Sequence, residues 1–287
     1  MTSANHDDEP ALPDGSGGLR RLRLDLSYDG TEFSGWARQP GRRTVEQVLA
    51  DAIATALGLP APPAIVVAGR TDAGVHATGQ VAHVDVAGDV AGDVVPMSLG
   101  ARLRGLLPAD VALRSVAVAA PGFDARFAAL ARSYRYRVTD RPPDPLRRRD
   151  TLAWRRPLDA TSMHDAAQGL LGEHDFAAYC RPKPGGTTVR SLHRLDVARP
   201  EPGDVVTVDA RADAFCHNQV RSMVGALLAV GDGRRPVDWP RRVLDAGVRD
   251  GAVTVAPPHG LTLVRVDYPP DEQLAARAAI TRNRRES

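Results

Sequence analysis

A loop between two apolar runs is the feature that most constrains how this chain folds. The run Ile65 to Val67 precedes the loop, and the valine-rich segment 81–86 follows it. Short apolar or alternating runs of this kind are typical of strands. Between them, residues 68–77 read Ala-Gly-Arg-Thr-Asp-Ala-Gly-Val-His-Ala. The pattern therefore predicts a glycine-bounded loop that presents side chains from a rigid pair of strands.

Two charged residues in this loop are candidates for chemistry. Arg70 and Asp72 lie two positions apart, so extended backbone would place both side chains on one face. A guanidinium beside a carboxylate favours the ionised form that a nucleophile or a base needs. An isolated Arg-x-Asp pair is more often a surface ion pair in a turn, which contributes little to stability. The remaining motifs have to decide between these two interpretations.

Composition restricts the class of protein only broadly. The 287 residues are 25% charged and 43% hydrophobic, as in an ordinary globular protein with one large domain or two smaller ones. The formal charge of +2 neither favours nor excludes a nucleic-acid partner. Cys180 and Cys216 lack a C-x-x-C spacing, so neither a disulfide framework nor a zinc site is predicted, and a reducing compartment fits. Without a signal peptide or an apolar run of membrane-spanning length, we expect a cytoplasmic protein.

Local patterns predict the elements and divide the chain into an α+β fold. Alternation from Arg21 to Tyr28 predicts a strand. Thr44 and Gln47 form a capping box for a helix that Gly58 ends. Further helices are expected over 96–107 and 159–171, and the segment 214–231 is expected to start at a strand end and become an apolar helix. Further strands are expected over 111–118, 131–137, 190–198, 205–212 and 260–268. The predicted organisation is a disordered tail (1–18), two α+β subdomains (19–139 and 158–268) joined by a linker (140–157), and a polar tail (269–287).

Two more segments carry candidate functional residues. In the strand 131–137, Tyr134 and Tyr136 share one face, and arginines occupy the other. Aromatic and arginine side chains together can stack on an unpaired base and grip its phosphate, although plain packing is the alternative. Arg221 is the one cation in the apolar helical part of the segment 214–231. It is either a functional group or a side chain that extends to the surface.

The loop 69–77 and the Gln-Val-Ala-His segment after it closely resemble the signature loop of the tRNA pseudouridine synthase A family. Four further stretches resemble family motifs, in the expected order, between about residue 20 and residue 268. The first two are Tyr-Asp-Gly-x-x-Phe-x-Gly-Trp-x-x-Gln at 28–39, and Phe-Asp-Ala-Arg-Phe at 123–127 with Ala-Arg-x-Tyr-Arg-Tyr at 131–136. The last two are Phe-x-x-x-x-Val-Arg-x-x-Val-Gly at 215–225 and the closing strand at 260–268. Asn218 and Gln219 depart from the pattern, because the family often has His-Met there.

The resemblance implies a fold, an activity and partners. The fold would be the α+β pseudouridine synthase fold, with two similar subdomains whose antiparallel sheets, flanked by helices, surround a central catalytic cleft. The activity would be isomerisation of uridine to pseudouridine at positions 38, 39 and 40 in the anticodon stem-loop of tRNA. The protein would be a homodimer that needs no cofactor and no metal, because the isomerisation gains neither electrons nor groups.

The resemblance also implies roles for individual residues. Asp72 would be the catalytic nucleophile, Arg70 would help to hold the flipped nucleotide, and Arg221 would keep Asp72 ionised. Tyr134 would stack on the base. The remaining substrate-binding candidates are Phe123, Asp124, Ala125, Arg126, Phe127 and Leu261.

Three alternatives are kept beside this interpretation. A non-catalytic RNA-binding module would explain the tyrosine and arginine strand but not the Arg70–Asp72 loop. A hydrolase that uses Asp72 with His76 or His83 would leave the other motifs without a purpose. A pseudouridine synthase that acts on another RNA position would carry the same motifs.

Overall fold

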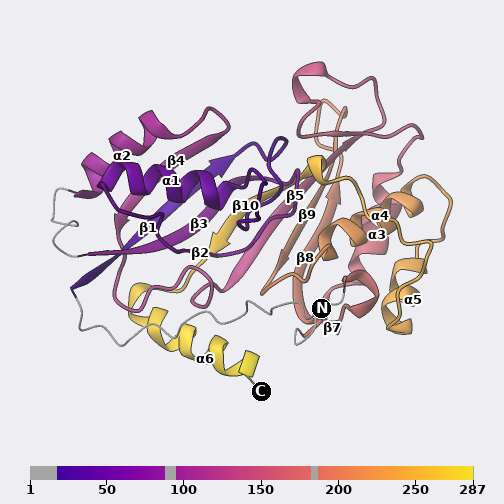
Figure 1. Ribbon diagram of the computed structural model, residues 1–287. Coiled ribbons are helices and arrows are strands. Elements are labelled where there is room, and N and C mark those ends of the chain that lie inside the picture. Colours follow the sequence, from indigo (N-terminus) through magenta and orange to yellow (C-terminus); the bar gives the residue numbers. More distant parts are fainter. Residues whose placement is uncertain (1–17, 88–94, 182–186, 287) are drawn as a thin grey trace, which may run out of the picture.

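The computed structural model describes residues 18–87, 95–181 and 187–286 (Figure 1). The predicted disordered tail, 1–18, therefore lies outside the described residues except for Gly18. In the part of the chain that is described, no helix is long and apolar enough to cross a membrane.

A single sheet of ten strands runs through the described residues (Figure 1). Its strands are β1 (Leu19–Tyr28), β2 (Ile65–Val67), β3 (His76–Ala87), β4 (Val111–Val118), β5 (Ala131–Thr139), β6 (Leu152–Ala153), β7 (Gly172–Asp175), β8 (Val189–Ala198), β9 (Val206–Ala212) and β10 (Leu261–Asp267). The order is β4-β1-β3-β10-β5-β9-β8-β7, with β2 paired to β3 and β6 paired to β5. All neighbours are antiparallel except β3 with β10 and β5 with β6.

Helices accompany both ends of this sheet (Figure 1). They are α1 (Val45–Leu57), α2 (Val95–Leu106), α3 (Ala160–Gln168), α4 (Gln219–Gly231), α5 (Trp239–Ala246) and α6 (Leu274–Glu286). Short 3-10 turns are η1 (Pro145–Arg147), η2 (Ala177–Tyr179), η3 (Pro258–Gly260) and η4 (Asp271–Gln273). In the ribbon, α1 and α2 lie over the strands of the first half, and α3, α4 and α5 lie beside those of the second.

The α+β class is confirmed, and the two predicted antiparallel sheets are joined into one. The join is β10, because Thr262 pairs with His76 of β3 while Leu261 pairs with Tyr136 of β5. A strand from the range 158–268 thus lies between two strands from the range 19–139. The division of the chain into subdomains on either side of 140–157 stays a prediction.

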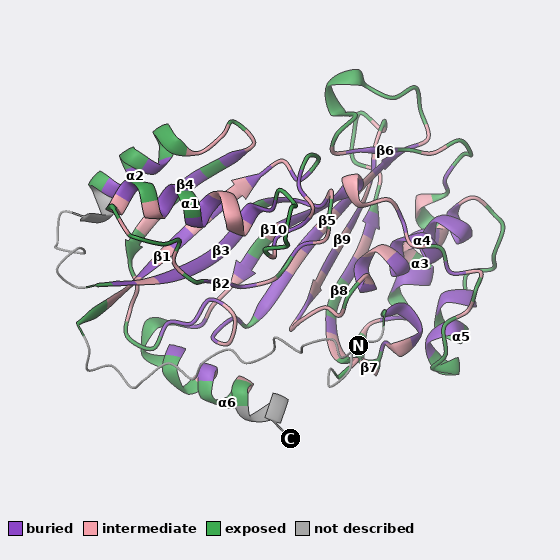
Figure 2. Ribbon diagram, viewed as in Figure 1, coloured by how far each residue is buried: buried purple, intermediate pink, exposed green. Residues whose placement is uncertain are grey.

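The predicted alternation explains the core of the first half (Figure 2). Leu22, Leu24 and Leu26 of β1 are fully buried, while Arg21 and Arg23 between them lie on the other face of the strand. That second face is covered too, because Arg21 pairs with Asp85 and donates to the carbonyl oxygen of residue 123. β1 therefore has one apolar buried face and one face of partly buried charged groups.

The capping prediction for α1 is confirmed at its main contacts. The Thr44 side chain accepts a hydrogen bond from the Gln47 amide, and Gly58 ends the helix in the left-handed region at φ 65°. The side chain of Gln47 differs from the prediction: it donates to Asp51 one turn later instead of reaching back. The helix begins and ends where the local sequence indicates.

Two segments predicted to lack regular elements contain some. In the range 140–157, Leu152 and Ala153 form β6 beside β5. In the range 269–287, the chain forms α6, with Leu274 and Ala278 buried. Both elements are stabilised by contacts with distant residues, which a local pattern does not reveal.

The two cysteines correct a prediction. Cys180 and Cys216 are joined in a disulfide, with 5.7 Å between their Cα atoms. They are 36 residues apart in the sequence. Only the fold brings the end of η2 beside the segment that leads into α4.

Candidate active site

The Gly-bounded loop joins β2 to β3, as predicted, and the segment that follows β1 holds it in place. Tyr28 and Thr71 share a hydrogen bond of 2.8 Å between their hydroxyl groups. The Trp36 amide donates to the Thr71 carbonyl oxygen at 3.0 Å, and the Gly74 amide donates to that of Phe33 at 3.3 Å. The Tyr-Asp-Gly-x-x-Phe-x-Gly-Trp segment is therefore the support of the loop, which explains why its aromatic residues are buried.

Two glycines in that support allow the backbones to touch. A Cβ atom on Gly30 would lie 2.0 Å from the Val75 carbonyl oxygen. Gly35 has φ 95° and lies against residues 71–73, where a Cβ would be 2.9 Å from the Thr71 carbonyl oxygen. Only glycine fits at such distances, so these two positions determine how closely the supporting segment approaches the loop.

Asp72 lies between two basic side chains from the second half of the chain. Its Oδ2 is 3.4 Å from the Arg221 Nη1, and its Oδ1 is 3.5 Å from the His217 Nε2. The Asp72 side chain is 32% exposed, whereas that of Arg221 is only 16% exposed. A partly buried guanidinium beside a carboxylate stabilises its negative charge. The carboxylate is thus accessible to a substrate and lies beside a cation.

Backbone and side-chain oxygens orient Arg221 toward Asp72. The Arg221 Nε donates to the Ala256 carbonyl oxygen at 2.7 Å, and its Nη1 also contacts the Asn218 Oδ1 at 3.3 Å. The Ala256 amide donates in return to the Arg221 carbonyl oxygen at 3.0 Å. Arg221 is therefore held against Asp72, and its side chain is not extended to the surface.

The departure at 218–219 has a structural explanation. Asn218 adopts φ 66°, a left-handed conformation that asparagine tolerates better than most residues, and its oxygen accepts from Arg221. Gln219 is fully buried, and its Oε1 accepts from the Cys216 amide at 3.0 Å. Both residues therefore shape the start of α4 next to the candidate catalytic group.

Tyr134 lies beside the loop on β5. Its ring packs edge to face on Phe215 with 5.3 Å between the ring centres. Its hydroxyl is 3.9 Å from the point where a Cβ on Gly69 would stand. Burial raises the pKa of Tyr134, and the negative charge of Asp72 is a further contribution. The hydroxyl therefore stays protonated at neutral pH and is able to donate a hydrogen bond or a proton.

The structure does not pair Arg70 with Asp72. Arg70 is exposed, and among the residues that the structure describes none forms an ion pair or hydrogen bond with its guanidinium. The neighbouring cation of Asp72 is Arg221, to which the resemblance gave that position, and not Arg70. Arg70 is instead a free cation at the rim of the loop.

The other predicted substrate-binding residues lie in two places. Residues 123–127 cover the face of β1 and β3 that carries Arg21, with Phe123 packed on Tyr268 at 5.0 Å between ring centres. Asp124 accepts from the amides of residues 126 and 127 and forms an ion pair with Arg282. Leu261 is buried in β10 beside Tyr136.

Two residues of this region were not predicted. The sequence gives one indication that His217 lies near Asp72, which is its position four residues before Arg221. Arg132 is the buried arginine of the Ala-Arg-Ser-Tyr segment, and it donates to the carbonyl oxygens of Ala68, Arg126 and Asp213 at 2.7–3.1 Å. It therefore links the start of the catalytic loop, the 123–127 segment and the approach to α4.

The α+β fold is that of a pseudouridine synthase. A family model described as tRNA pseudouridine synthase matches residues 166–269. The tRNA pseudouridine synthase A of Frankia casuarinae is 62% identical over 92% of this chain and 95% of its own length, and that of Mycobacterium leprae is 50% identical over 93% and 96%. The chain belongs to the tRNA pseudouridine synthase A family, whose members are enzymes.

A solved structure titled as a Cbf5-Nop10-Gar1 complex aligns with 72% of this chain and 54% of that chain, at 12% identity and a TM-score of 0.29. At that score the alignment carries no argument about function.

Proposed function

We propose that the chain isomerises uridine to pseudouridine at positions 38, 39 and 40 of the tRNA anticodon stem-loop, with Asp72 as the catalytic residue. The observation that carries this proposal is the accessible Asp72 carboxylate between Arg221 at 3.4 Å and His217 at 3.5 Å. Family membership supports the reaction, and the geometry of Asp72 supports the choice of catalyst.

The reaction moves one bond and needs no external reactant. The bond between uracil N1 and ribose C1′ breaks, the base turns, and C5 joins C1′. The proton on C5 is lost, and N1 gains one, so atoms and electrons balance. Asp72 either forms a transient covalent bond to the nucleoside or removes a ribose proton, and both steps require an ionised carboxylate. The Arg221 guanidinium stabilises that charge, and the His217 ring lies beside it.

The target nucleotide has to leave the base stack before Asp72 reaches it. Arg70 is exposed at the rim of the loop and is free to fill the vacated position in the stack. Tyr134 lies beside the loop with a hydroxyl that stays protonated, because burial raises its pKa. It therefore offers both a ring for stacking on the uracil and a proton donor for the turning base.

We also propose that the enzyme is a homodimer in the cytoplasm, where its tRNA substrates are found. Light scattering coupled to size exclusion measures the mass directly. A strict monomer at micromolar concentration and in the presence of tRNA would contradict the dimer.

The activity is tested with tRNA transcripts that carry uridine only at positions 38, 39 and 40, or only elsewhere. Isomerisation confined to the first set is the expected result. Isomerisation of another loop would assign a different RNA position. Binding without isomerisation would indicate an RNA-binding module, and release of a free base or a cleaved chain would indicate a hydrolase.

A further inference from the structure

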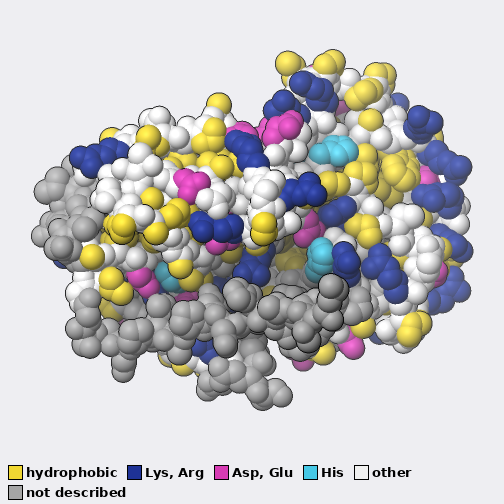
Figure 3. Space-filling view, viewed as in Figure 1, with side chains coloured by type: hydrophobic (Ala, Val, Ile, Leu, Met, Phe, Trp, Pro, Cys, Tyr) yellow, Lys and Arg dark blue, Asp and Glu magenta, His cyan; other side chains and the backbone are white. Residues whose placement is uncertain are grey.

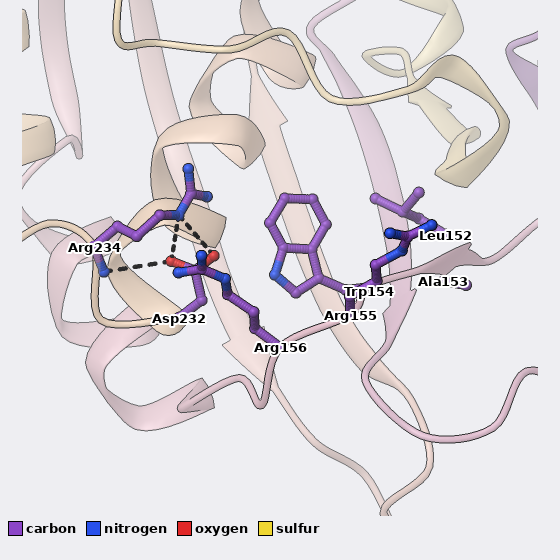
Figure 4. Close-up of a pocket in the computed structure, with 7 residues that line it drawn as sticks. All are labelled: Leu152, Ala153, Trp154, Arg155, Arg156, Asp232 and Arg234. Carbon is purple, nitrogen blue, oxygen red and sulfur yellow. Dashed lines mark hydrogen bonds and ion pairs between the residues drawn. The ribbon is translucent and has the colours of Figure 1, made fainter.

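A cavity of about 380 Å³ lies apart from the candidate active site, between β6 and the end of α4 (Figure 4). Its lining includes Leu152, Trp154, Arg155, Arg156, Asp232 and Arg234. A volume of this size is at the lower end of the range for small-ligand pockets. It therefore has room for one planar group, such as a nucleobase.

The cavity offers an aromatic surface with an unused hydrogen-bond donor. Trp154 is half-buried, and its indole Nε1 is buried with no hydrogen-bond partner among the described residues. In the close-up, the nitrogen edge of the ring faces the side where Asp232 and Arg156 lie (Figure 4). A buried donor without a partner is unfavourable, so an acceptor on a bound group would stabilise this arrangement.

Positive charge surrounds the indole. Arg234 lies 5.8 Å from the Trp154 ring centre, and both oxygens of the buried Asp232 accept from its Nε at 2.8 Å. Arg155 and Arg156 are exposed, and no described residue forms an ion pair or hydrogen bond with either guanidinium. The neighbouring carboxylate is thus already neutralised, and two cations remain for an anionic ligand.

Two elements connect this cavity to the candidate active site. Along β5, five residues separate Tyr134 from Thr139, whose carbonyl oxygen accepts from the Trp154 amide at 2.7 Å, a separation of about 17 Å. Along α4, eleven residues separate Arg221 from Asp232, or about 16 Å. A stacked strand with about 3.4 Å per nucleotide covers that distance in about five nucleotides.

We infer that this cavity, the Trp154 pocket, is a second nucleotide-binding site for the RNA substrate. An unpaired base stacks on the Trp154 indole, a base or sugar oxygen accepts from its Nε1, and flanking phosphates contact Arg155 and Arg156. The inference rests on the proposed function, because the ligand of the pocket is the tRNA that Asp72 is proposed to act on. The competing occupant is a second copy of this chain. That copy would have to bring carboxylates to the two unpaired arginines.

The test is the equilibrium binding of unmodified tRNA by the full chain. Trp154→Ala and the double variant Arg155→Ala/Arg156→Ala should each raise Kd about tenfold, the scale of one stacked base or a few phosphate contacts. The loss should appear in KM rather than in kcat, because the site is remote from Asp72. Trp154→Phe keeps a stacking face and should lose less than Trp154→Ala.

The matched control is Arg241→Ala/Arg242→Ala. These consecutive arginines on α5 are exposed like Arg155 and Arg156, but they pair with Asp245 and Asp238. This double variant removes the same charge from the same half of the molecule and should bind tRNA within about threefold of the parent. Addition of tRNA should also quench indole fluorescence in the parent and not in Trp154→Phe. Circular dichroism melts check that each variant is folded.

Three results would overturn the site. One is a Kd for either Trp154→Ala or Arg155→Ala/Arg156→Ala that equals that of the Arg241→Ala/Arg242→Ala control. The second is a tRNA-induced quench of indole fluorescence that is equal in the parent and in Trp154→Phe. The third is a lower oligomeric mass for Trp154→Ala than for the parent, which would assign the pocket to a protein interface. Failure of the proposed function is separate, because it appears as parent enzyme that binds tRNA without isomerising uridine.

Discussion

At the scale of single residues, Asp72 gives the sharpest test of the proposed function. Replacing one carboxylate oxygen by an amide nitrogen removes the charge that a catalyst needs and leaves a group that is still able to bind. Asp72→Asn keeps the size of the side chain and removes the negative charge beside Arg221. We expect isomerisation to fall below detection while Kd for tRNA stays within about threefold, because the lost interaction acts on turnover and not on binding. A pseudouridine assay and an equilibrium binding assay measure the two effects.

The control for that change is Asp245→Asn, which removes an exposed carboxylate that pairs with Arg241. It should alter neither turnover nor binding by more than about twofold, as for a typical surface ion pair. Substantial pseudouridine formation by purified Asp72→Asn would contradict the assignment of Asp72 as the catalytic residue.

His83 gives a second residue-scale prediction, on stability. Burial, followed by the charge of Arg21, lowers the pKa of His83 to about 4 from 6.5, and its Nδ1 accepts from the Ala125 amide at 3.0 Å. Between these pH values the unfolded chain binds a proton that the folded chain does not bind. The free energy of unfolding is therefore expected to fall by about 3 kcal/mol as the pH drops from 6.5 to 4.

Urea unfolding at several pH values measures this dependence. His83→Asn keeps an acceptor for the Ala125 amide and removes the titrating ring, so its unfolding free energy should fall less steeply over the same range. Most carboxylates are remote from His83 and titrate alike in both proteins, so the readout is the difference in slope between parent and variant. Identical slopes in parent and variant would contradict the assignment to His83.

At the scale of elements, the contact between α4 and the segment 252–258 determines where Arg221 points. A Cβ on Gly225 would lie 1.8 Å from the Thr254 carbonyl oxygen. Gly225→Ala should therefore push α4 and this segment apart, lower the free energy of unfolding by about 1–3 kcal/mol and reduce turnover through Arg221. Urea unfolding and single-turnover rates measure both effects.

Gly105→Ala is the matched control, since Gly105 lies in α2 with no heavy atom within 4 Å of the added Cβ. It should raise the free energy of unfolding by about 0.4–1 kcal/mol by restricting the unfolded chain. Equal stability and turnover in Gly225→Ala and the parent would show that the α4 contact does not position Arg221.

At the scale of the whole molecule, charge is distributed unevenly. The net charge is only +2, yet Arg side chains gather over the half that carries α3, α4 and α5 (Figure 3). We expect tRNA binding to weaken at least tenfold between about 50 and 200 mM salt, because each neutralised phosphate releases a counterion. Titrations of labelled tRNA at several KCl concentrations measure the slope. A slope equivalent to fewer than about two released ions would contradict phosphate binding by this half.

The sequence by itself determined the catalytic loop and the elements next to it. Residues 65–86 predict a strand, a glycine-bounded loop and a strand, and β2 and β3 with the intervening loop are found there. Thr44 and Gly58 likewise mark the ends of α1. These features are readable because alternation, capping and glycine turns depend on neighbours within a few positions. The family motifs identified Asp72, Arg221 and Tyr134 as candidates, and the structure brings these three together.

Only the tertiary structure decided which groups meet. Arg221 and Asp72 are 149 positions apart, and the position of His217 beside Asp72 has no local signature. The same holds for β10 between β3 and β5, for α6 against the 123–127 segment, and for the Cys180–Cys216 disulfide. Each of these depends on burying surfaces of distant segments against one another. Short-range periodicity encodes that a segment has a buried face, but not which other segment covers it.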